Sequence, residues 1–445
     1  MQETTIKTDP ADVASRLDRL PVTALHLLVI GLCSLGFVFD LMEVALGSVL
    51  SAVFSTPPNA APARELSMLL ASMYVGAVIG APALGWVADR HGRRITLIGV
   101  LLWLAASSVA AAASSGMDAL ILWRALSGLA LGAYPPLMIS YMTDLLPPAR
   151  RGLLFMVMGS VAALGAPLAI FGVRALAAHP STGLEAWRWG FLIGAMGAAV
   201  IGLLFFRLPE SPRWLKAQGR DAEADRACRA FETSRVVMAA QGTAEPVAER
   251  TPEAQTAPRH GPWPRVAALF LFSPWATVAF PLLSGALLAQ KGFGLSDTLL
   301  YIGVSTFGPL IGNVLSALGL DKLDRRRLLM LCAAGMMIGG ALFVQTSEPW
   351  LLVTANLVFG IAGSIYILAL NLYGAELFPT ARRATSLAGA WALNRLGAVL
   401  APLLLLPLLK SSGPGAMFAV IGATLAASIA VLALSPQGRQ GQSVS

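Results

Sequence analysis

Long apolar stretches separated by short polar ones run along almost the whole chain. Each stretch reaches the roughly 20 residues that an α-helix needs to cross a bilayer. None shows the two-residue alternation that a membrane β-barrel requires. The pattern therefore predicts an all-α polytopic membrane protein with transmembrane helices at twelve places: 23–53, 66–88, 95–114, 118–143, 153–177, 187–207, 266–290, 296–320, 328–346, 350–375, 384–409 and 414–434.

Composition supports this interpretation and excludes several classes of protein. Hydrophobic residues make up 56% of the 445 residues, and charged residues only 13%. A soluble domain is about a quarter charged, so lipid must cover much of this surface. The chain has no G-x-x-x-x-G-K-[ST] phosphate loop and no G-x-S-x-G motif, and its three cysteines lack metal-ligand spacing. We therefore expect neither an ATP-driven pump nor an enzyme, and no metal or other cofactor.

The distribution of basic residues predicts the topology. The polar N-terminal segment shows no cleavable signal peptide. If it lies inside, the short inner loops hold eleven lysines and arginines and the outer loops and their borders five. This positive-inside bias predicts a multi-pass protein of the inner (plasma) membrane with both termini in the cytoplasm. The net charge of +8 then reflects topology, and we expect no nucleic-acid partner.

Polar sequence between the sixth and seventh spans divides the chain into two halves. The division predicts a cytoplasmic tail at 1–22, a six-helix bundle at 23–207, a linker with a short amphipathic helix at 208–265, a second bundle at 266–434 and a tail at 435–445. The linker changes from a charged, helical pattern to a Pro-, Ala- and Glu-rich one, which is typical of disorder.

The two halves share motifs at a constant spacing. Asp89 in GWVADRHGRR corresponds to Asp321 in ALGLDKLDRRR, 232 residues later. Asp144 in DLLPPARRG corresponds to Glu376 in ELFPTARRA at the same spacing. This agreement predicts a parallel duplication, with the halves related by an axis along the membrane normal.

Four motifs carry a resemblance to a known family: GWVADRHGRR, RALSGLALG, PESPRWL and AELFPTARR. Over nearly its whole length the chain resembles the major facilitator superfamily, and the last two motifs resemble the branch of sugar porters and organic-acid porters. The resemblance implies transport by alternating access at a site between the halves near the membrane midplane.

Charged residues at the inner helix ends are candidates for gating. A carboxylate there can meet a helix N-terminus and a cation at once, and such contacts can hold one conformation and break in another. The alternative is ordinary positive-inside charge. The candidates are Asp89, Arg90, Arg93, Arg94, Asp144, Arg150, Asp321, Arg325, Glu376 and Arg382.

Two acids lie within the first apolar span. An ionised side chain at bilayer depth costs at least about 2.5–3.5 kcal/mol, so each needs a reason. Asp40 and Glu43 are three residues apart and share a helical face, which predicts that they titrate as a coupled, proton-carrying pair. The alternative is a static pair neutralised by Arg124 or Arg395. The resemblance associates Arg124, in RALSGLALG, with structure and proton coupling.

A buried arginine in the eleventh span is the candidate substrate ligand. The planar fork of Arg395 fits a carboxylate, and the nearby Trp391 suits an aromatic or planar acid. The alternative is a structural partner for the two acids. Further candidates for the substrate site are the polar residues Asn394, Tyr366, Asn371 and Tyr134.

The acid-x-x-acid pattern in the first span and the Arg395 context resemble aromatic-acid:proton symporters and niacin-type transporters. We therefore expect a proton-coupled symporter of a small organic anion, an aromatic or heterocyclic carboxylate, working as a monomer in the lipid bilayer and driven by the proton gradient. Alternatives are proton-coupled uptake of a sugar or neutral metabolite, proton-driven efflux of drugs or metabolites, and a non-transporting sensor. The fifth span lacks the Gln and Asn typical of sugar sites.

Overall fold

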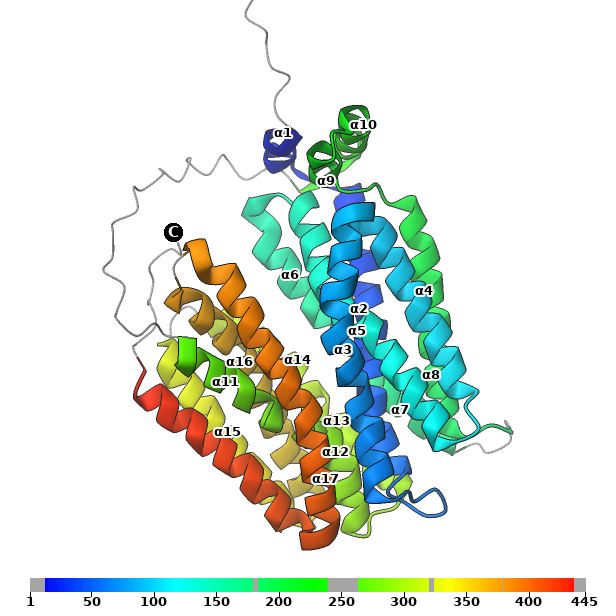
Figure 1. Ribbon diagram of the computed structural model, residues 1–445, viewed down its shortest axis with the longest axis vertical. Helices are drawn as coiled ribbons and strands as arrows, with labels where there is room; N and C mark the ends of the chain where they lie inside the picture. The colour runs from blue at the N-terminus through cyan, green and yellow to red at the C-terminus, as the bar shows by residue number, and fades with distance from the viewer. Residues whose placement is uncertain (1–12, 179–182, 239–262, 320–323, 379, 436–445) are drawn as a thin grey trace, which may run out of the picture.

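Two bundles of long helices lie side by side in the computed structural model (Figure 1), which describes residues 13–178, 183–238, 263–319, 324–378 and 380–435. The first bundle contains α2 to α8 and the second α11 to α17. The helices are α1 (Val13–Arg19), α2 (Ala24–Val53), α3 (Ala63–His91), α4 (Arg93–Ala112), α5 (Met117–Leu145), α6 (Pro148–Ala162), α7 (Gly165–Ala177), α8 (Ala186–Leu204), the 3-10 turn η2 (Phe205–Arg207), α9 (Pro212–Ala217), α10 (Asp221–Glu232), α11 (Trp263–Thr277), α12 (Ala279–Gln290), α13 (Leu295–Ser305), α14 (Phe307–Gly319), α15 (Arg325–Gln345), α16 (Pro349–Leu377) and α17 (Thr380–Ala433).

The predicted all-α polytopic fold is confirmed. Among the described residues, ten stretches are long and apolar enough to cross a membrane. The tenth, within α17, is broken at Gly413, where a positive φ of 83° reverses the chain and gives two crossings. α5 is not among the ten, but it packs between α3 and α4 as a further crossing. Together these elements account for the twelve predicted spans.

Three of the predicted spans are broken near their middle, which the apolar pattern did not predict. Each break is followed by a proline, and a proline cannot donate the backbone hydrogen bond to the carbonyl four residues earlier. The carbonyls affected lie at the breaks between α6 and α7, α11 and α12, and α13 and α14. The prolines are Pro167, Pro281 and Pro309, and the carbonyls belong to Ala163, Thr277 and Ser305.

Glycines let α3 and α5 approach each other closely. A Cβ at Gly76 would overlap the carbonyl oxygen of Ala125, and one at Gly128 would overlap that of Met73. Gly132 meets α3 in the same way one turn further on. Small residues at a helix interface permit such contact in membranes, where tight packing replaces the hydrophobic effect. Any side chain added here would force the two helices apart.

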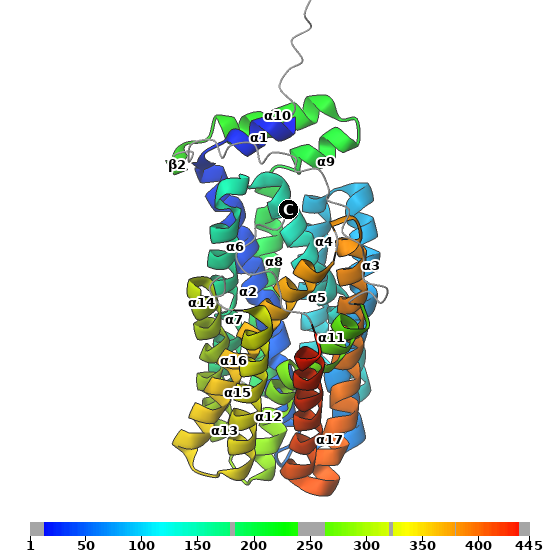
Figure 2. The same ribbon diagram turned by 90° about the vertical axis from the view of Figure 1, so that its left-hand side faces the viewer.

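Among the described residues, the halves meet where α2 packs against α12 and α13, α3 against α17, α7 against α13, and α6 against α14. We call the end of the bundle that carries α9 and α10 the linker end, and the opposite end the far end (Figures 1 and 2). Hydrogen bonds between described residues join the halves toward the far end: Lys410 Nζ donates to Ala61 O at 2.6 Å, Arg174 Nε to Ser296 O at 3.1 Å, and Ala286 N to Ser51 Oγ at 3.2 Å.

The N-terminal segment and the linker form a cap on the linker end (Figure 2). β1 (Val22–Thr23) pairs antiparallel with β2 (Val236–Met238), a small sheet that the sequence did not predict. Arg16 of α1 forms salt bridges with Asp225 at 2.7 Å and Glu232 at 2.8 Å. Hydrogen bonds from Arg16 lower the pKa of both carboxyl groups, so the contact is present at neutral pH and weakens as pH falls through these lowered values.

Candidate functional site

Glu43 is held in a buried salt bridge inside the first half. Its Oε1 lies 2.8 Å from Arg124 Nη1, and both side chains are 1% exposed. Ser108 donates to Glu43 Oε2 at 3.0 Å, and Arg124 Nη2 lies 3.1 Å from Met73 Sδ. The Phe191 ring covers the guanidinium at 5.5 Å. α2, α4 and α5 thus enclose Glu43 completely, and the opposite charge that it needs is supplied by its own half.

Asp40 lies in a different environment, although it is one turn away on the same helix. Its side chain is buried, and Oδ1 has no hydrogen-bond partner among the described residues. The cation that interacts with it electrostatically is Arg395 of α17, in the other half. Asp40 and Arg395 form no salt bridge, since none within 4.0 Å joins these two described residues. Asp40 is therefore a buried acid whose compensating charge lies across the interface between the halves.

Arg395 rests on an aromatic support. Its guanidinium carbon lies 5.8 Å from the centre of the Trp391 ring. Trp391 Nε1 donates to Asn371 Oδ1 of α16 at 3.0 Å, and Phe270 of α11 packs edge-on against the same ring at 5.6 Å. Tyr74 of α3 lies near Arg395. Because α16 and α11 fix the indole, the guanidinium is presented toward α2 and α3.

The other predicted substrate residues are occupied in helix packing. Asn394 Nδ2 donates to Ser273 Oγ at 2.8 Å, inside the second half. The Tyr134 hydroxyl donates to Cys33 O at 2.9 Å and fills the space beside Gly36. Tyr366 is 1% exposed. The structure brings Arg395, Trp391 and Asn371 together. Asn394, next to Arg395 in the chain, is turned into the second half, and Tyr134 lies near Asp40. Sequence reasoning missed Tyr74 and Ser108, since single hydroxyl groups in apolar spans carry no distinguishing pattern.

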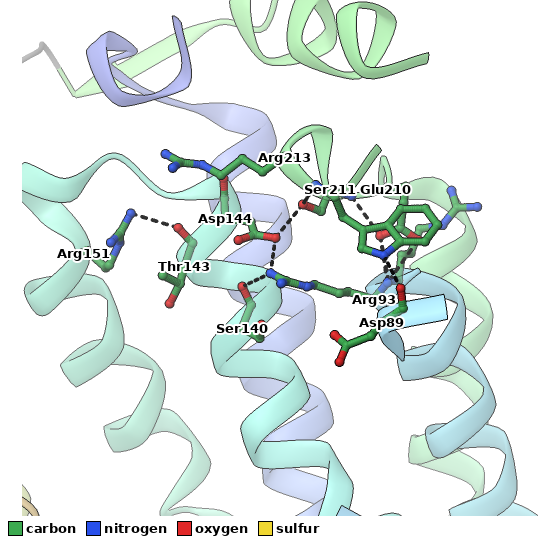
Figure 3. A network of polar contacts seen from close by, with 11 residues as sticks. Asp89, Arg93, Ser140, Thr143, Asp144, Arg151, Glu210, Ser211 and Arg213 are labelled. Atoms are coloured by element: carbon green, nitrogen blue, oxygen red, sulfur yellow. Dashed lines mark hydrogen bonds and ion pairs between the residues drawn. The ribbon is translucent and has the colours of Figure 1, made fainter. Parts of the chain in front are cut away.

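A polar network at the linker end joins α4, α5 and α9 (Figure 3). Arg93 forms a salt bridge with Asp144 and donates to Ser140 O at 3.1 Å. Ser211 donates to Asp144 Oδ2 at 2.6 Å, and Arg213 Nε donates to Asp144 O at 3.1 Å. Asp144 is thus the centre of the network, and its contacts connect the first half to the linker that leads to the second.

Glu210, which is not among the gating candidates, is the carboxylate at the N-terminus of α4. It accepts hydrogen bonds from Arg93 N at 3.1 Å and Arg94 N at 3.0 Å. Asp89 instead offers its backbone oxygen to Trp214 Nε1 at 3.0 Å (Figure 3). The positive φ of Gly92 aims the start of α4 at the linker, so the linker supplies the acid. Glu210 belongs to the motif PESPRWL, which was the sequence feature that could have pointed to this cap.

The second half repeats the ion pair but not the cap. Arg325 and Glu376, each 232 residues beyond Arg93 and Asp144, lie 3.3 Å apart. In the first half the position before α4 is Gly92, and Glu210 of the linker caps the helix. In the second half the equivalent position is Asp324, whose side chain accepts a hydrogen bond from Arg326 N at 3.0 Å and caps α15. Asp324 thus caps α15 from within the second half, whereas the cap of α4 comes from the linker.

The remaining gating candidates lie apart from these pairs. Arg90 stacks on Trp86 at 4.3 Å, and Arg94 donates to Leu208 O at 2.6 Å. Arg150 Nε is buried without a hydrogen-bond partner in the described part of the chain. Asp321 and the side chain of Arg382 lie outside the described residues.

The family profile of the Major Facilitator Superfamily matches residues 28–402, which run from the first span into the eleventh and leave out the twelfth. The chain belongs to the Major Facilitator Superfamily. It is therefore a multi-pass membrane transporter of small molecules and not an enzyme, and the family prediction is confirmed.

Individual proteins resemble this member of the superfamily over nearly its whole length. A niacin transporter of Acinetobacter baylyi is 24% identical over 447 residues, covering 97% of this chain and 99% of its own. A gallate transporter of Pseudomonas putida is 28% identical over 439 residues, covering 95% of each. The partially occluded, inward-open structure of the xylose transporter XylE from E. coli superimposes with a TM-score of 0.72 at 22% identity, covering 94% of this chain and 98% of that one.

Gly92→Ala tests the linker-end network of this superfamily member. Gly92 has φ 105° and ψ 153°, a conformation that costs other residues roughly 1–3 kcal/mol, and a Cβ there would overlap the Glu210 carboxylate. We expect a loss of stability of at least about that size, measured by thermal unfolding in detergent. Gly99→Ala in the same helix is the control, because a Cβ there meets nothing. Equal stability of the two variants would show that Glu210 does not depend on this turn.

Proposed function

We propose that this transporter is a proton-coupled symporter of a small aromatic or heterocyclic carboxylate. The observation that carries the proposal is the placement of Asp40 and Arg395 on opposite halves, with Asp40 Oδ1 buried and without a hydrogen-bond partner among the residues that the structure describes. A proton on Asp40 and an anion on Arg395 each remove a charge from the interface between the halves. Since burying unpaired charge is costly, loading both together favours movement of the halves past each other.

Arg395 and Trp391 support the choice of substrate. A guanidinium over an indole offers a two-pronged donor for a carboxylate beside an aromatic surface for a planar ring. Niacin and gallate, which the two relatives carry by name, both bear a carboxylate on a planar ring. The shared chemistry of these substrates matches the two groups that the second half presents.

The same region offers little to a neutral sugar. Sugar recognition needs free amide and hydroxyl groups. Both amides near Arg395 are already used, Asn371 by Trp391 and Asn394 by Ser273. This occupation favours an anion over a neutral substrate.

Alternating access completes the proposal. The hydrogen bonds from Lys410 and Arg174 close the far end in this conformation, and they must break when that end opens. We place the linker end and both termini in the cytoplasm of a cell with this protein in its inner membrane, on the positive-inside bias. The proton gradient is the energy source, no cofactor is required, and a single chain contains both halves of the site.

The direct test is uptake into proteoliposomes from a set of small carboxylates, with xylose and glucose as neutral comparisons, under an imposed pH gradient. We expect saturable uptake of an aromatic or heterocyclic acid that collapses when the gradient is dissipated. Uptake of the sugars alone, or transport indifferent to pH, would reject the proposal.

Arg395→Lys tests the substrate contact. Lysine keeps the charge but loses the planar fork, so one charge-assisted hydrogen bond, about 1.5–3 kcal/mol, is lost. We expect KM for the carboxylate to rise roughly 10- to 100-fold with protein stability unchanged. Arg220→Lys is the matched control, because Arg220 lies at a similar distance, 5.9 Å, over Trp214 but outside the membrane. An unchanged KM in Arg395→Lys would exclude bidentate binding.

A further inference from the structure

A groove with a volume of about 490 Å³ lies at the linker end, between the start of α4 and the linker helices α9 and α10. Its lining includes the arginines Arg94, Arg220 and Arg226, the ring of Trp214, and the acids Glu210 and Glu223. The transport cycle proposed above uses neither the groove nor Arg226. The groove lies at the border of the apolar spans, where a ligand can reach it from the membrane surface.

The charges in the groove favour an anion. Glu210 is committed to the backbone N–H groups at the start of α4, so its charge is already compensated. Arg226 forms no salt bridge with any described residue, and Arg94 Nε is buried without a hydrogen-bond partner there. Within the described part of the chain, Arg220 is the groove arginine that pairs with a carboxylate, donating to both oxygens of Glu223 at 2.8 and 2.7 Å. Two guanidinium groups that pair with no described carboxylate, those of Arg94 and Arg226, therefore line one groove.

The apolar surface next to the groove indicates that the anion is attached to a lipid. Ile95 lines the groove and is 42% exposed, at the first turn of a membrane-spanning helix. Phe206 and Leu203, on the adjoining η2 and α8, are more than half exposed. Since α4 packs against both elements, exposed apolar side chains lie on the helices next to the groove.

We propose that this groove binds the phosphate of an anionic phospholipid from the leaflet at the linker end, with Arg94 and Arg226 as its ligands. The acyl chains then follow the exposed face of α4 and α8. A phosphate group can accept hydrogen bonds from both guanidinium groups at once. Anionic lipids are concentrated in the cytoplasmic leaflet, where the positive-inside bias places this end. The proposal does not depend on which substrate is transported.

Arg226→Gln tests the site in the full-length protein. Purified protein is titrated with phosphatidylglycerol or phosphatidylcholine in nanodiscs, and retained lipid is counted by native mass spectrometry. We expect about a tenfold loss of phosphatidylglycerol retention, the size of one charge-assisted hydrogen bond, and no change for phosphatidylcholine. Arg229→Gln is the matched control on the same helix, because Arg229 is outside the groove and paired with Asp225. Equal losses in both variants would mean diffuse surface attraction and overturn the proposal.

Glu223→Gln is expected to increase phosphatidylglycerol retention, a change that misfolding of the variant would not produce. Removing this carboxylate frees the Arg220 guanidinium and subtracts a negative charge from the groove, so phosphatidylglycerol retention should rise severalfold. Inorganic phosphate and glycerol phosphate, added as competitors, separate the two sources of a phosphate group. Displacement of the lipid at millimolar phosphate would assign the groove to a soluble anion. Unchanged or lower phosphatidylglycerol retention in Glu223→Gln would reject the groove as an anion site.

Discussion

Asp40→Asn is expected to abolish uptake driven by a pH gradient. Asparagine keeps the size and the hydrogen-bonding capacity of the side chain but cannot exchange a proton. Coupling between two ligands of one protein is typically worth about 5- to 150-fold, and all of it should disappear. Uptake by the wild type should rise as the outside is acidified, whereas uptake by the variant should be flat. The measurement is initial uptake in proteoliposomes at several imposed gradients.

Substrate exchange separates loss of coupling from loss of binding. With Asp40 permanently neutral, the protein still holds its anion on Arg395, so exchange of labelled for unlabelled substrate should continue without a gradient. Asp118→Asn is the control, because Asp118 is an exposed acid at the far-end start of α5. If Asp40→Asn keeps a pH-driven uptake, the proton is carried elsewhere. If it loses exchange as well, Asp40 belongs to substrate binding and not to coupling.

The spacing of the two acids predicted their shared helix face but not their different partners. Side chains three residues apart on an α-helix diverge by about 60°. That angle is enough, in a helix surrounded on all sides, to direct Glu43 to α5 and Asp40 toward α17. Which neighbour occupies each direction depends on how twelve helices pack, and the sequence of one helix does not contain that information.

In the network at the linker end, too, the sequence predicted some contacts and not others. The constant spacing of 232 predicted the correspondence of Asp144 and Glu376, and the structure shows each paired with an arginine at the same spacing. The cap by Glu210 escaped prediction because the linker occurs once and the repeat gives no counterpart for comparison. The proline breaks escaped because apolarity shows that a segment spans the membrane and not whether it is continuous.

Arg124→Met is expected to cause the largest loss of stability of any single substitution considered. It leaves Glu43, 1% exposed, without its cation, and removing one partner of a buried pair costs about 3–5 kcal/mol. Arg229→Met is the control, because the 69% exposed side chain of Arg229 pairs with Asp225 at 2.7 Å, and such surface pairs contribute about 0–1 kcal/mol. Thermal unfolding in detergent and the yield of monodisperse protein give the comparison.

The double variant Glu43→Met with Arg124→Met shows what the pair does. Replacing both members of a buried ion pair is often neutral or stabilising, so the double variant should recover most of the lost stability. Its transport then decides between the two interpretations of the pair. Intact proton-driven uptake means that Glu43 and Arg124 are a structural brace, and Asp40 alone carries the proton. A folded protein that exchanges substrate but no longer responds to pH means that the proton also depends on Glu43, and the two acids act together despite their separate partners.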